Sequence, residues 1–209
     1  MRTIAIIQAR LSSSRLPGKV LMDIEGLPML ARVVDRVSAS RLIDGVAVAT
    51  SSDPSDDRLA AYCRSHGIRH HRGPLEDVLA RFLHAAQREE ADVIVRITAD
   101  CPLIDPALID AVVTIRDAHR ADYASNVLNR RYPRGLDVEV FTAEALARAD
   151  REGREPYHRE HVTPYLYEKP GRFQMVGLDC ERDLSHHRWT VDALADLELV
   201  RAIYHRLDN

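Results

Sequence analysis

Short apolar runs alternate with amphipathic stretches along the first 120 residues of the chain. Apolar runs of strand length indicate buried strands, and apolar residues repeated every three or four positions indicate helices that pack on one face. We therefore expect strands at 4–7, 46–49, 68–72 and 93–97, and helices at 28–39, 56–66, 78–86 and from 106 to about 115. The strand at 68–72 is the most polar and should lie near an edge. Strands that alternate with helices predict a mainly parallel sheet with helices on both faces.

The rhythm changes from about Tyr123 onward. Strand candidates at 136–141, 173–178 and 188–191 are separated by longer connections and two or three helices, and a last helix is expected at 193–207. No linker rich in Gly, Ser or Pro divides the two halves. We therefore predict one α/β domain over residues 1–209, with a Rossmann-like mixed, mainly parallel sheet. Its second half should extend the sheet and cover a site.

The composition is typical of a globular protein and argues against several functions. The 209 residues are 45% hydrophobic and 29% charged, with a net charge of −3, whereas a general nucleic-acid-binding protein would be strongly basic. No apolar run is long enough to cross a membrane, and no signal peptide is recognisable. The three cysteines are an odd number without metal-like spacing, which indicates reduced thiols and a cytoplasmic location.

The segment 8–19 follows the first strand and concentrates positive charge. It contains Arg10, Arg15, Lys19, three serines and Gly18, but little that could be buried. Guanidinium groups bind phosphate oxygens through paired hydrogen bonds, serine hydroxyls and backbone N–H groups add neutral donors, and Gly18 lets the backbone come close to a ligand. Ligands of open α/β sheets bind at the carboxyl ends of the strands. The segment therefore predicts a polyphosphate site, and the alternative is a solvated basic loop.

Asp100 and Asp192 each follow an expected strand. Asp100 comes after the run 93–97 and should face the same sheet edge as the basic segment. A carboxylate there would repel a polyphosphate unless a divalent cation lay between them, and Mg²⁺ is commonly held by one or two carboxylates plus phosphate oxygens. We therefore expect Asp100 to bind Mg²⁺, with a turn or helix-start role as the alternative. Asp192 precedes the last helix, so both capping and metal binding are open to it.

Two further segments carry polar side chains that could form a site. Residues 132–141 place Asp137 and Glu139 on one face of an expected strand, although a solvent-facing edge strand explains the pattern equally well. Residues 155–165 gather His, Arg and Glu on an expected helix, where His158 and His161 could share a face. A zinc site would need further ligands, which the sequence does not supply.

Six motifs lie in order along nearly the whole chain. They are Ile7–Arg10 with Leu16–Leu21, Arg72–Gly73 with Asp77–Phe82, Val95–Asp105, Tyr132–Phe141, Arg159–Tyr165, and Arg188–Asp192 with Asp196–Leu197. In these motifs the chain resembles the cytidylyltransferases related to CMP-Kdo synthetase, in particular the spore-coat polysaccharide biosynthesis protein F group. The resemblance implies the nucleotide-diphospho-sugar transferase fold. It also implies transfer of CMP from CTP to an acceptor, with release of pyrophosphate.

The resemblance further implies roles for residues by position, with nucleotide binding in residues 1–120. The expected triphosphate grip is Arg10, Ser13, Arg15 and Lys19, and Gln8, Ala9 and Asp100 are also expected to bind the nucleotide. The expected cytidine pocket is Arg72, Gly73, Asp77 and Arg81. The expected Mg²⁺ ligands are Asp100 and Asp192. Residues 121–209 should hold the acceptor, through Arg134, Asp137, Glu139, Arg159, Glu160 and His161. The expected catalytic residues are Arg10, Arg15, Lys19 and Asp100.

The implied partners are CTP and a small acidic sugar or related acceptor used in surface polysaccharide or glycoconjugate precursor synthesis. The implied cofactor is Mg²⁺, and the implied assembly is a homodimer with contacts in residues 121–209. One alternative is a nucleotidyltransferase for another base, although such enzymes usually begin with a glycine-rich loop, where this chain has Gln8-Ala9-Arg10. Another is a non-catalytic nucleotide-binding subunit, against which the intact Lys19, Asp100 and Asp192 argue.

Overall fold

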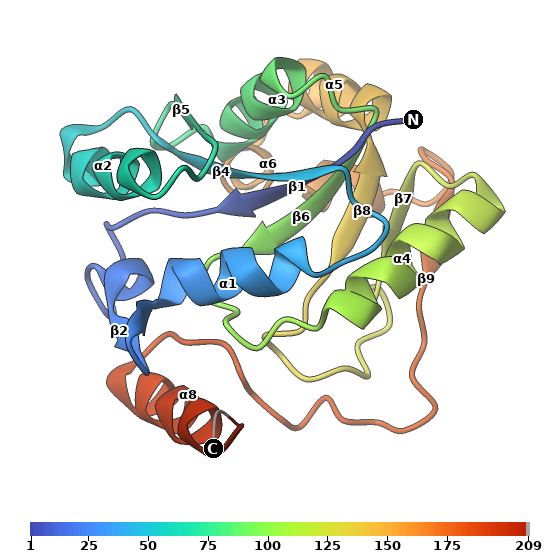
Figure 1. The fold of residues 1–209 in the computed structure, drawn as a ribbon. Helices are drawn as coiled ribbons and strands as arrows, with labels where there is room; N and C mark the ends of the chain where they lie inside the picture. The colour runs from blue at the N-terminus through green and yellow to red at the C-terminus, as the bar shows by residue number, and fades with distance from the viewer. Residues whose placement is uncertain (208–209) are drawn as a thin grey trace.

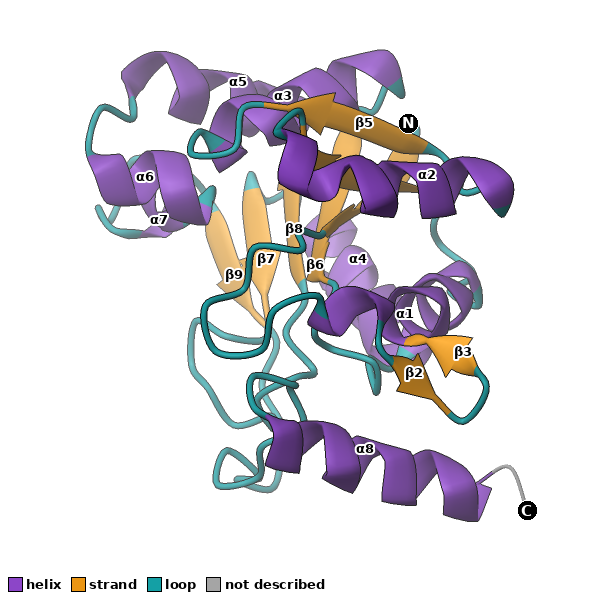
Figure 2. Cartoon of the chain, turned by 90° about the vertical axis from the view of Figure 1, so that its left-hand side faces the viewer, coloured by secondary structure: helices purple, strands orange, loops and turns teal. Residues whose placement is uncertain are grey.

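The computed structural model describes residues 1–207 and is built on a seven-stranded sheet (Figures 1 and 2). The strands are β1 (Thr3–Gln8), β4 (Gly45–Ser51), β5 (His70–Gly73), β6 (Val93–Thr98), β7 (Tyr123–Ser125), β8 (Glu139–Thr142) and β9 (Met175–Gly177). Their order is β5-β4-β1-β6-β8-β7-β9. The strands β5, β4, β1 and β6 are parallel, β8 is antiparallel to β6 and β7, and β9 is parallel to β7. The predicted mixed, mainly parallel sheet is confirmed, with β5 at an edge.

Helices cover both faces of the sheet, as predicted (Figure 2). On one face lie α1 (Met29–Ser38), α2 (Asp57–Ser65) and α4 (Pro106–His119). On the other face lie α3 (Val78–Arg88), α5 (Ala143–Glu152), α6 (Pro156–His161) and α7 (Pro164–Tyr167). The apolar residues that the 3.6-residue period selects fill the two cores, for example Val33 on α1 and Phe82 on α3, which are both fully buried. Two 3-10 turns, η1 (Lys19–Leu21) and η2 (Pro54–Asp56), flank the sheet edge.

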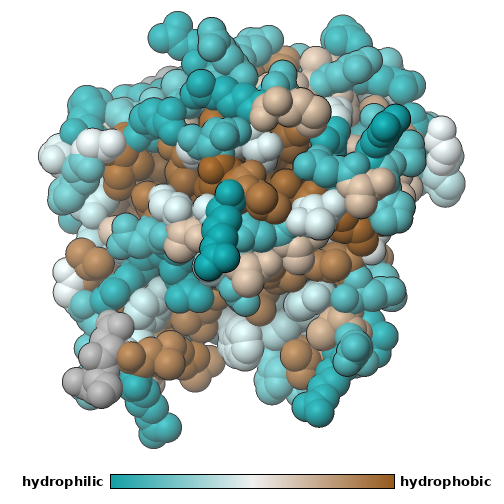
Figure 3. Space-filling view, turned by 45° about the vertical axis from the view of Figure 1, so that its right-hand side comes forward, coloured by the Kyte–Doolittle hydropathy of each residue, from teal (hydrophilic) through white to brown (hydrophobic). Residues whose placement is uncertain are grey.

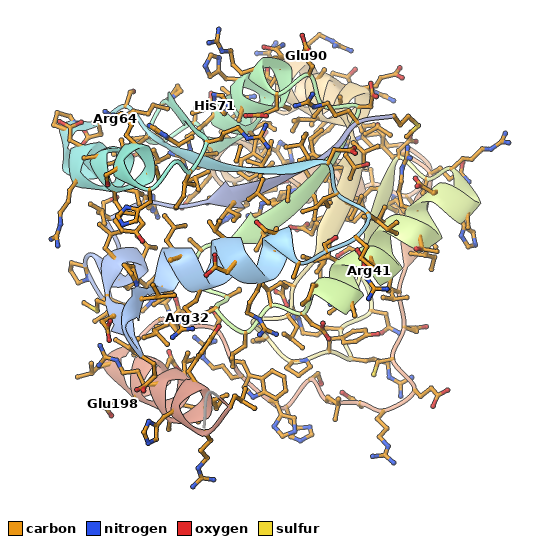
Figure 4. All side chains as sticks on the ribbon, in the orientation of Figure 1. Arg32, Arg41, Arg64, His71, Glu90 and Glu198 are labelled. Atoms are coloured by element: carbon orange, nitrogen blue, oxygen red, sulfur yellow. The ribbon has the colours of Figure 1, made fainter. Side chains whose placement is uncertain are left out.

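The last helix, α8 (Leu194–Leu207), packs on the short hairpin of β2 (Asp23–Ile24) and β3 (Leu27–Pro28) rather than on the main sheet. Arg32 belongs to α1, and its side chain lies on the side of that helix that faces α8 (Figure 4). Its Nε donates to the Ile24 carbonyl at 3.1 Å, and its guanidinium lies 4.6 Å from the centre of the Tyr204 ring. The small core beneath α8 consists of Ile24, Met29, Val191, Leu197, Val200 and Tyr204. This packing holds the residues just before α8 against the hairpin.

The expected strand at 136–141 begins only at Glu139, because a side chain takes the place of a strand partner before it. The Asn126 amide nitrogen donates to the Leu136 carbonyl at 2.7 Å, and its oxygen accepts from the Val138 N–H at 2.9 Å. Buried backbone groups need partners, and here an amide side chain supplies them without forming a ladder. The preceding β7 was not expected at all, because three residues carry too little pattern to identify a strand.

The expected strand at 188–191 is wrong. This segment crosses the 130–136 loop through a single bridge between Arg134 and Arg188, where the Trp189 N–H donates to the Arg134 carbonyl at 2.6 Å. Gly135 makes the crossing possible, because it has φ 104° and a Cβ there would lie 2.5 Å from the Thr190 nitrogen. The crossing carries the chain toward the sheet edge.

Polar side chains cover most of the face shown in Figure 3, with apolar patches between them. Such scattered apolar surface is ordinary for a globular protein. Within residues 1–207, no helix combines the length and the apolar character needed to span a membrane.

Candidate active site

A cavity of about 210 Å³ opens at the carboxyl ends of β1 and β6. It is lined by the 8–20 segment, by residues at and just after the end of β6, and by one residue that precedes α8. The lining residues are Gln8, Ala9, Arg10, Ser13, Ser14, Arg15, Lys19, Val20, Thr98, Ala99, Asp100 and Asp192. The structure therefore brings the whole expected triphosphate grip together with both expected metal ligands, as the position of the motifs after parallel strands predicts.

The basic loop is anchored by a buried carboxylate that sequence reasoning missed. Asp56 is fully buried, and its Oδ1 accepts from the Leu11 N–H at 2.6 Å. Its Oδ2 accepts from the Ser51 N–H at 3.2 Å and from the Ser51 hydroxyl. The loop closes on itself where the N–H of Gly18, at φ 72°, donates to the Leu11 carbonyl at 2.9 Å. Asp56 thus ties the loop to the end of β4.

Lys19 joins the two acids that lie 92 positions apart in the chain. Its Nζ donates to Asp100 Oδ2 at 2.9 Å, to Asp192 Oδ1 at 3.1 Å and to the Val191 carbonyl at 2.6 Å. The expected closeness of Asp100 and Asp192 is therefore present. The Lys19 ammonium lies between the two carboxylates at the wall of the cavity, and its expected contact with phosphates stays a prediction.

The Asp192 side chain pairs with cationic side chains, and within residues 1–207 it accepts a hydrogen bond from no N–H group of α8. Besides its contact with Lys19, it forms an ion pair with Arg15 at 2.9 Å and accepts a hydrogen bond from Arg188. Burial opposes ionisation of Asp192, but the hydrogen bonds from Lys19 and Arg188 outweigh it and hold its pKa below the ordinary value. The free N–H groups before α8 are satisfied by Asp196, whose Oδ2 accepts from Asp192 at 2.8 Å and from Ala193 at 2.9 Å. The capping alternative for Asp192 is wrong.

The arrangement around Asp100 and Asp192 fits a divalent cation. Both carboxylates reach one point that a positive ammonium group already occupies, and the cavity beside them has room for phosphate oxygens. Mg²⁺ accepts one or two carboxylates when phosphates and water complete its octahedron. Protein ligands alone would not hold it, because residues 1–207 contain no cluster of three or more His, Cys, Asp or Glu side chains suited to a metal.

The expected cytidine-side residues lie around the start of α3, outside the lining of the cavity. Asp77 caps α3 by accepting from the Ala80 N–H at 2.9 Å, and Arg72 donates to the Ser51 carbonyl at 2.7 Å. Gly73 packs against Arg81, since a Cβ on it would lie 3.1 Å from Arg81 backbone and side-chain atoms. Arg81 is fully buried, and burial lowers its pKa to about 10. Its Nε and Nη2 have no partner among residues 1–207, so this side of the site holds unpaired donors.

A second cavity of about 250 Å³ lies on the other side of Thr98, which lines both cavities. Its other lining residues are Arg96, Val127, Asp137, Glu139, His161, Thr163 and Tyr167. Of the expected acceptor residues, Asp137, Glu139 and His161 are thus brought together. Asp137 is held by a two-pronged contact from Arg130 at 2.7 and 2.8 Å. Glu139 is buried rather than solvent-facing.

The other expected acceptor residues lie outside this cavity. Arg159 donates to Asp77 at 2.7 Å and to Asp150 at 2.6 Å, so it ties α6 to the start of α3. Arg134 takes part in the backbone crossing near Arg188, and Glu160 is exposed on α6. Arg96 was missed by the sequence reasoning. A charged residue in the middle of the apolar run 93–97 was the signal that could have found it.

Comparisons with known proteins agree with this geometry. A family model described as cytidylyltransferase matches residues 4–204. The spore coat polysaccharide biosynthesis protein SpsF of Bacillus subtilis (strain 168) is 35% identical over 208 residues, which cover 96% of this chain and 85% of that protein. A 3-deoxy-manno-octulosonate cytidylyltransferase of Acidovorax sp. (strain JS42) is 34% identical over 184 residues, which cover 80% of this chain and 66% of that protein.

A solved structure is also similar over nearly the whole chain. It is a cytidylyltransferase from Leptospira borgpetersenii serovar Hardjo-bovis (strain JB197), with a TM-score of 0.93 and 34% identity. The similarity covers 99% of this chain and 87% of that one. The sheet order and the helices on both faces are thus those of a nucleotide-diphospho-sugar transferase fold, as the motifs predicted.

Proposed function

Because the chain belongs to the cytidylyltransferase family and is a CTP-dependent nucleotidyltransferase, we propose that it transfers CMP to a sugar acid or related acidic acceptor. Pyrophosphate is the other product, and the CMP-linked sugar serves surface polysaccharide or glycoconjugate synthesis. The names of the relatives support this choice, since one acts on 3-deoxy-manno-octulosonate and another belongs to spore coat polysaccharide biosynthesis. The observation that carries the proposal is the meeting of a basic loop with Asp100 and Asp192 at one cavity.

In the proposed reaction, an acceptor oxygen attacks the α-phosphorus of CTP in line with the departing pyrophosphate. Such transfer needs little covalent chemistry from the protein, so catalysis rests on positioning and charge neutralisation. The Arg10 guanidinium lines the cavity and hydrogen-bonds to no acceptor within residues 1–207, and Arg15 is 67% exposed, so both can turn toward phosphates. We propose that they stabilise the negative charge that develops on the leaving pyrophosphate.

Asp100 and Asp192 would hold Mg²⁺, which when bound supplies positive charge to the phosphate oxygens. Lys19 bridges these two acids and offsets part of their negative charge. Because Lys19 lines the cavity, the same ammonium can turn to phosphate once nucleotide and Mg²⁺ arrive. Thr98 lies between the two cavities, so we place the acceptor in the second cavity, beside Asp137 and His161.

The base pocket at the start of α3 rests on the resemblance, and the buried Arg81 there, whose Nε and Nη2 have no partner within residues 1–207, supports it. Cytosine presents a carbonyl oxygen and an unprotonated ring nitrogen as acceptors, which suits such donors. The competing function is a non-catalytic nucleotide-binding subunit. It finds less support, because a binding role alone would not need Asp100 and Asp192 beside the basic loop.

A pyrophosphate-release assay tests the proposal. Wild-type protein with Mg²⁺ is incubated with CTP, UTP, GTP or ATP against a panel of sugar acids that includes 3-deoxy-manno-octulosonate. We expect release with CTP and an acidic acceptor only. Equal release with another nucleotide would overturn the base assignment, and release that no acceptor stimulates would overturn the transfer.

We also propose, on the resemblance, that the protein is a cytoplasmic homodimer. Sedimentation equilibrium tests its assembly.

A further inference from the structure

Gln8 stands where the two cavities meet. It is the last residue of β1, it pairs in register with Thr98 on β6, and it lines the phosphate cavity. Thr98 lines both cavities, and Arg96, two positions earlier on β6, lines the second one. A group on Gln8 that points into this space can therefore contact either the nucleotide or the acceptor.

The neighbours of Gln8 leave its side-chain amide one orientation. Arg96 Nη2 lies 3.0 Å from the amide oxygen of Gln8. A guanidinium carries donors only, so the oxygen must face Arg96 and the NH₂ group must face away from it. Within residues 1–207, no group accepts a hydrogen bond from Gln8 Nε2, and this nitrogen is not among the buried unpaired atoms. Two N–H donors are thus presented to the cavity.

Arg96 is itself fixed by a buried carboxylate. Its Nη1 pairs with Glu139 Oε2, and the Tyr123 hydroxyl donates to Glu139 Oε1 at 2.7 Å. The Arg96 side chain is 15% exposed and that of Glu139 is 8% exposed, so the ion pair is largely shielded from solvent. Glu139 neutralises the charge of Arg96. What reaches the space between the cavities is the neutral, oriented amide of Gln8.

We infer that Gln8 donates through Nε2 to an anionic oxygen at the junction of the two cavities. Arg96, Glu139 and Tyr123 are positioning residues that keep the amide turned this way. The inference rests on the proposed function, because the transfer reaction must bring two anionic groups to this junction. The oxygen belongs either to the α-phosphate of the nucleotide or to the carboxylate of the acceptor, and the experiment separates these sources.

The test compares two substitutions of the same residue. Gln8→Glu keeps an oxygen facing Arg96 but puts an oxygen where the NH₂ group was, whereas Gln8→Met removes the donor without adding charge. A hydrogen bond to a charged group is lost in both, so we expect kcat/KM for pyrophosphate release to fall by about tenfold or more. Gln87→Glu, at an exposed position on α3, is the control for added negative charge. The melting temperature of Gln8→Glu should match that of wild type.

Two binding measurements identify the oxygen. If it lies on the nucleotide, both Gln8 variants bind CTP and CMP more weakly in titration calorimetry, by about tenfold. If it lies on the acceptor, CTP binding is unchanged and the KM for 3-deoxy-manno-octulosonate rises instead. Arg96→Lys, which offers one point donor in place of a fork, should affect the same parameter. It should add little to Gln8→Glu in the double variant, because both act through one amide.

The outcomes distinguish a failure of the inference about Gln8 from a failure of the proposed function. Both Gln8 variants within about twofold of wild type in CTP affinity, in turnover and in the KM for 3-deoxy-manno-octulosonate would overturn the inference while leaving the proposed function intact. Wild-type protein that releases no pyrophosphate with any acidic acceptor would overturn the proposed function, and the inference with it.

Discussion

We expect Lys19 to stabilise the pair of carboxylates at the site when no substrate is bound, and replacing it by Met tests this. The substitution keeps most of the side-chain stem but removes the ammonium group that joins Asp100 and Asp192. The Lys19 side chain is 10% exposed, and the two acids are 26% and 15% exposed. Removing one partner of a buried ion pair costs about 3–5 kcal/mol, because the remaining charge is left uncompensated. Because the acids are partly exposed to solvent, which screens their charge, we expect the free energy of unfolding to fall by about 2–3 kcal/mol.

The loss should depend on pH and on Mg²⁺. In the wild type, the lowered pKa of Asp192 means that its contribution is present above the unfolded-state pKa and is lost as pH falls through the folded-state value. Without Lys19, the two carboxylates repel each other, so the deficit of the variant should be larger at neutral pH than near pH 4. Mg²⁺ supplies a replacement cation, so it should stabilise Lys19→Met more than it stabilises the wild type.

Urea unfolding in EDTA and in Mg²⁺, at both pH values, measures these differences. Lys169→Met is a matched control, because Lys19 and Lys169 are the two lysines of the chain and Lys169 is exposed on the connection after α7. A Lys19→Met protein as stable as Lys169→Met in EDTA at neutral pH would refute the reasoning. It would mean that the ammonium contributes nothing to holding the two acids together.

Three further predictions follow from named contacts. Asp192→Asn should lower turnover by about tenfold or more. Asp196→Ala should lower the free energy of unfolding by about 1 kcal/mol, because a helix cap is lost, and should keep turnover near wild type. The reverse pattern would contradict the assignment of Asp192 to the active site and of Asp196 to the cap. CTP with Mg²⁺ should raise the melting temperature more than UTP, GTP or ATP does, and equal shifts would remove the cytidine assignment. Burial opposes ionisation of Glu168, but hydrogen bonds from Tyr157 and His158 outweigh it and lower its pKa to about 2, so this group stabilises above pH 4.5 and loses its effect between 4.5 and 2. The stability gap between wild type and Glu168→Gln should therefore close over that interval in acid unfolding, and a constant gap would contradict it.

The parts of the fold that follow from local pattern could be predicted from the sequence. The apolar runs of β1, β4 and β6 and the helical period of α1, α3 and α4 each appear within one stretch of chain. The basic loop, Asp100 and Asp192 could also be placed at one edge, because parallel strands bring their carboxyl ends together. These elements are determined by periodicity and topology alone.

The remaining features depend on contacts between distant segments. Asn126 replaces a strand partner for residues 136–138, and Gly135 lets the 188–191 segment cross instead of pairing. Neither event changes the local hydrophobic pattern, so a strand was expected where none forms. Asp56 reads as an ordinary helix-start residue until the fold places it under Leu11. The orientation of Gln8 likewise depends on Arg96, 88 positions away.

Transfer of the α-phosphate of CTP is the central claim, and an isotope experiment tests it most directly. CTP labelled with ³²P at the α-position is incubated with Mg²⁺, the wild-type protein and the acidic acceptor that stimulates pyrophosphate release. We predict that the label moves into an acceptor-linked CMP product and that the released pyrophosphate is unlabelled. Label that stays in CTP, or that appears only as free CMP, would contradict the account.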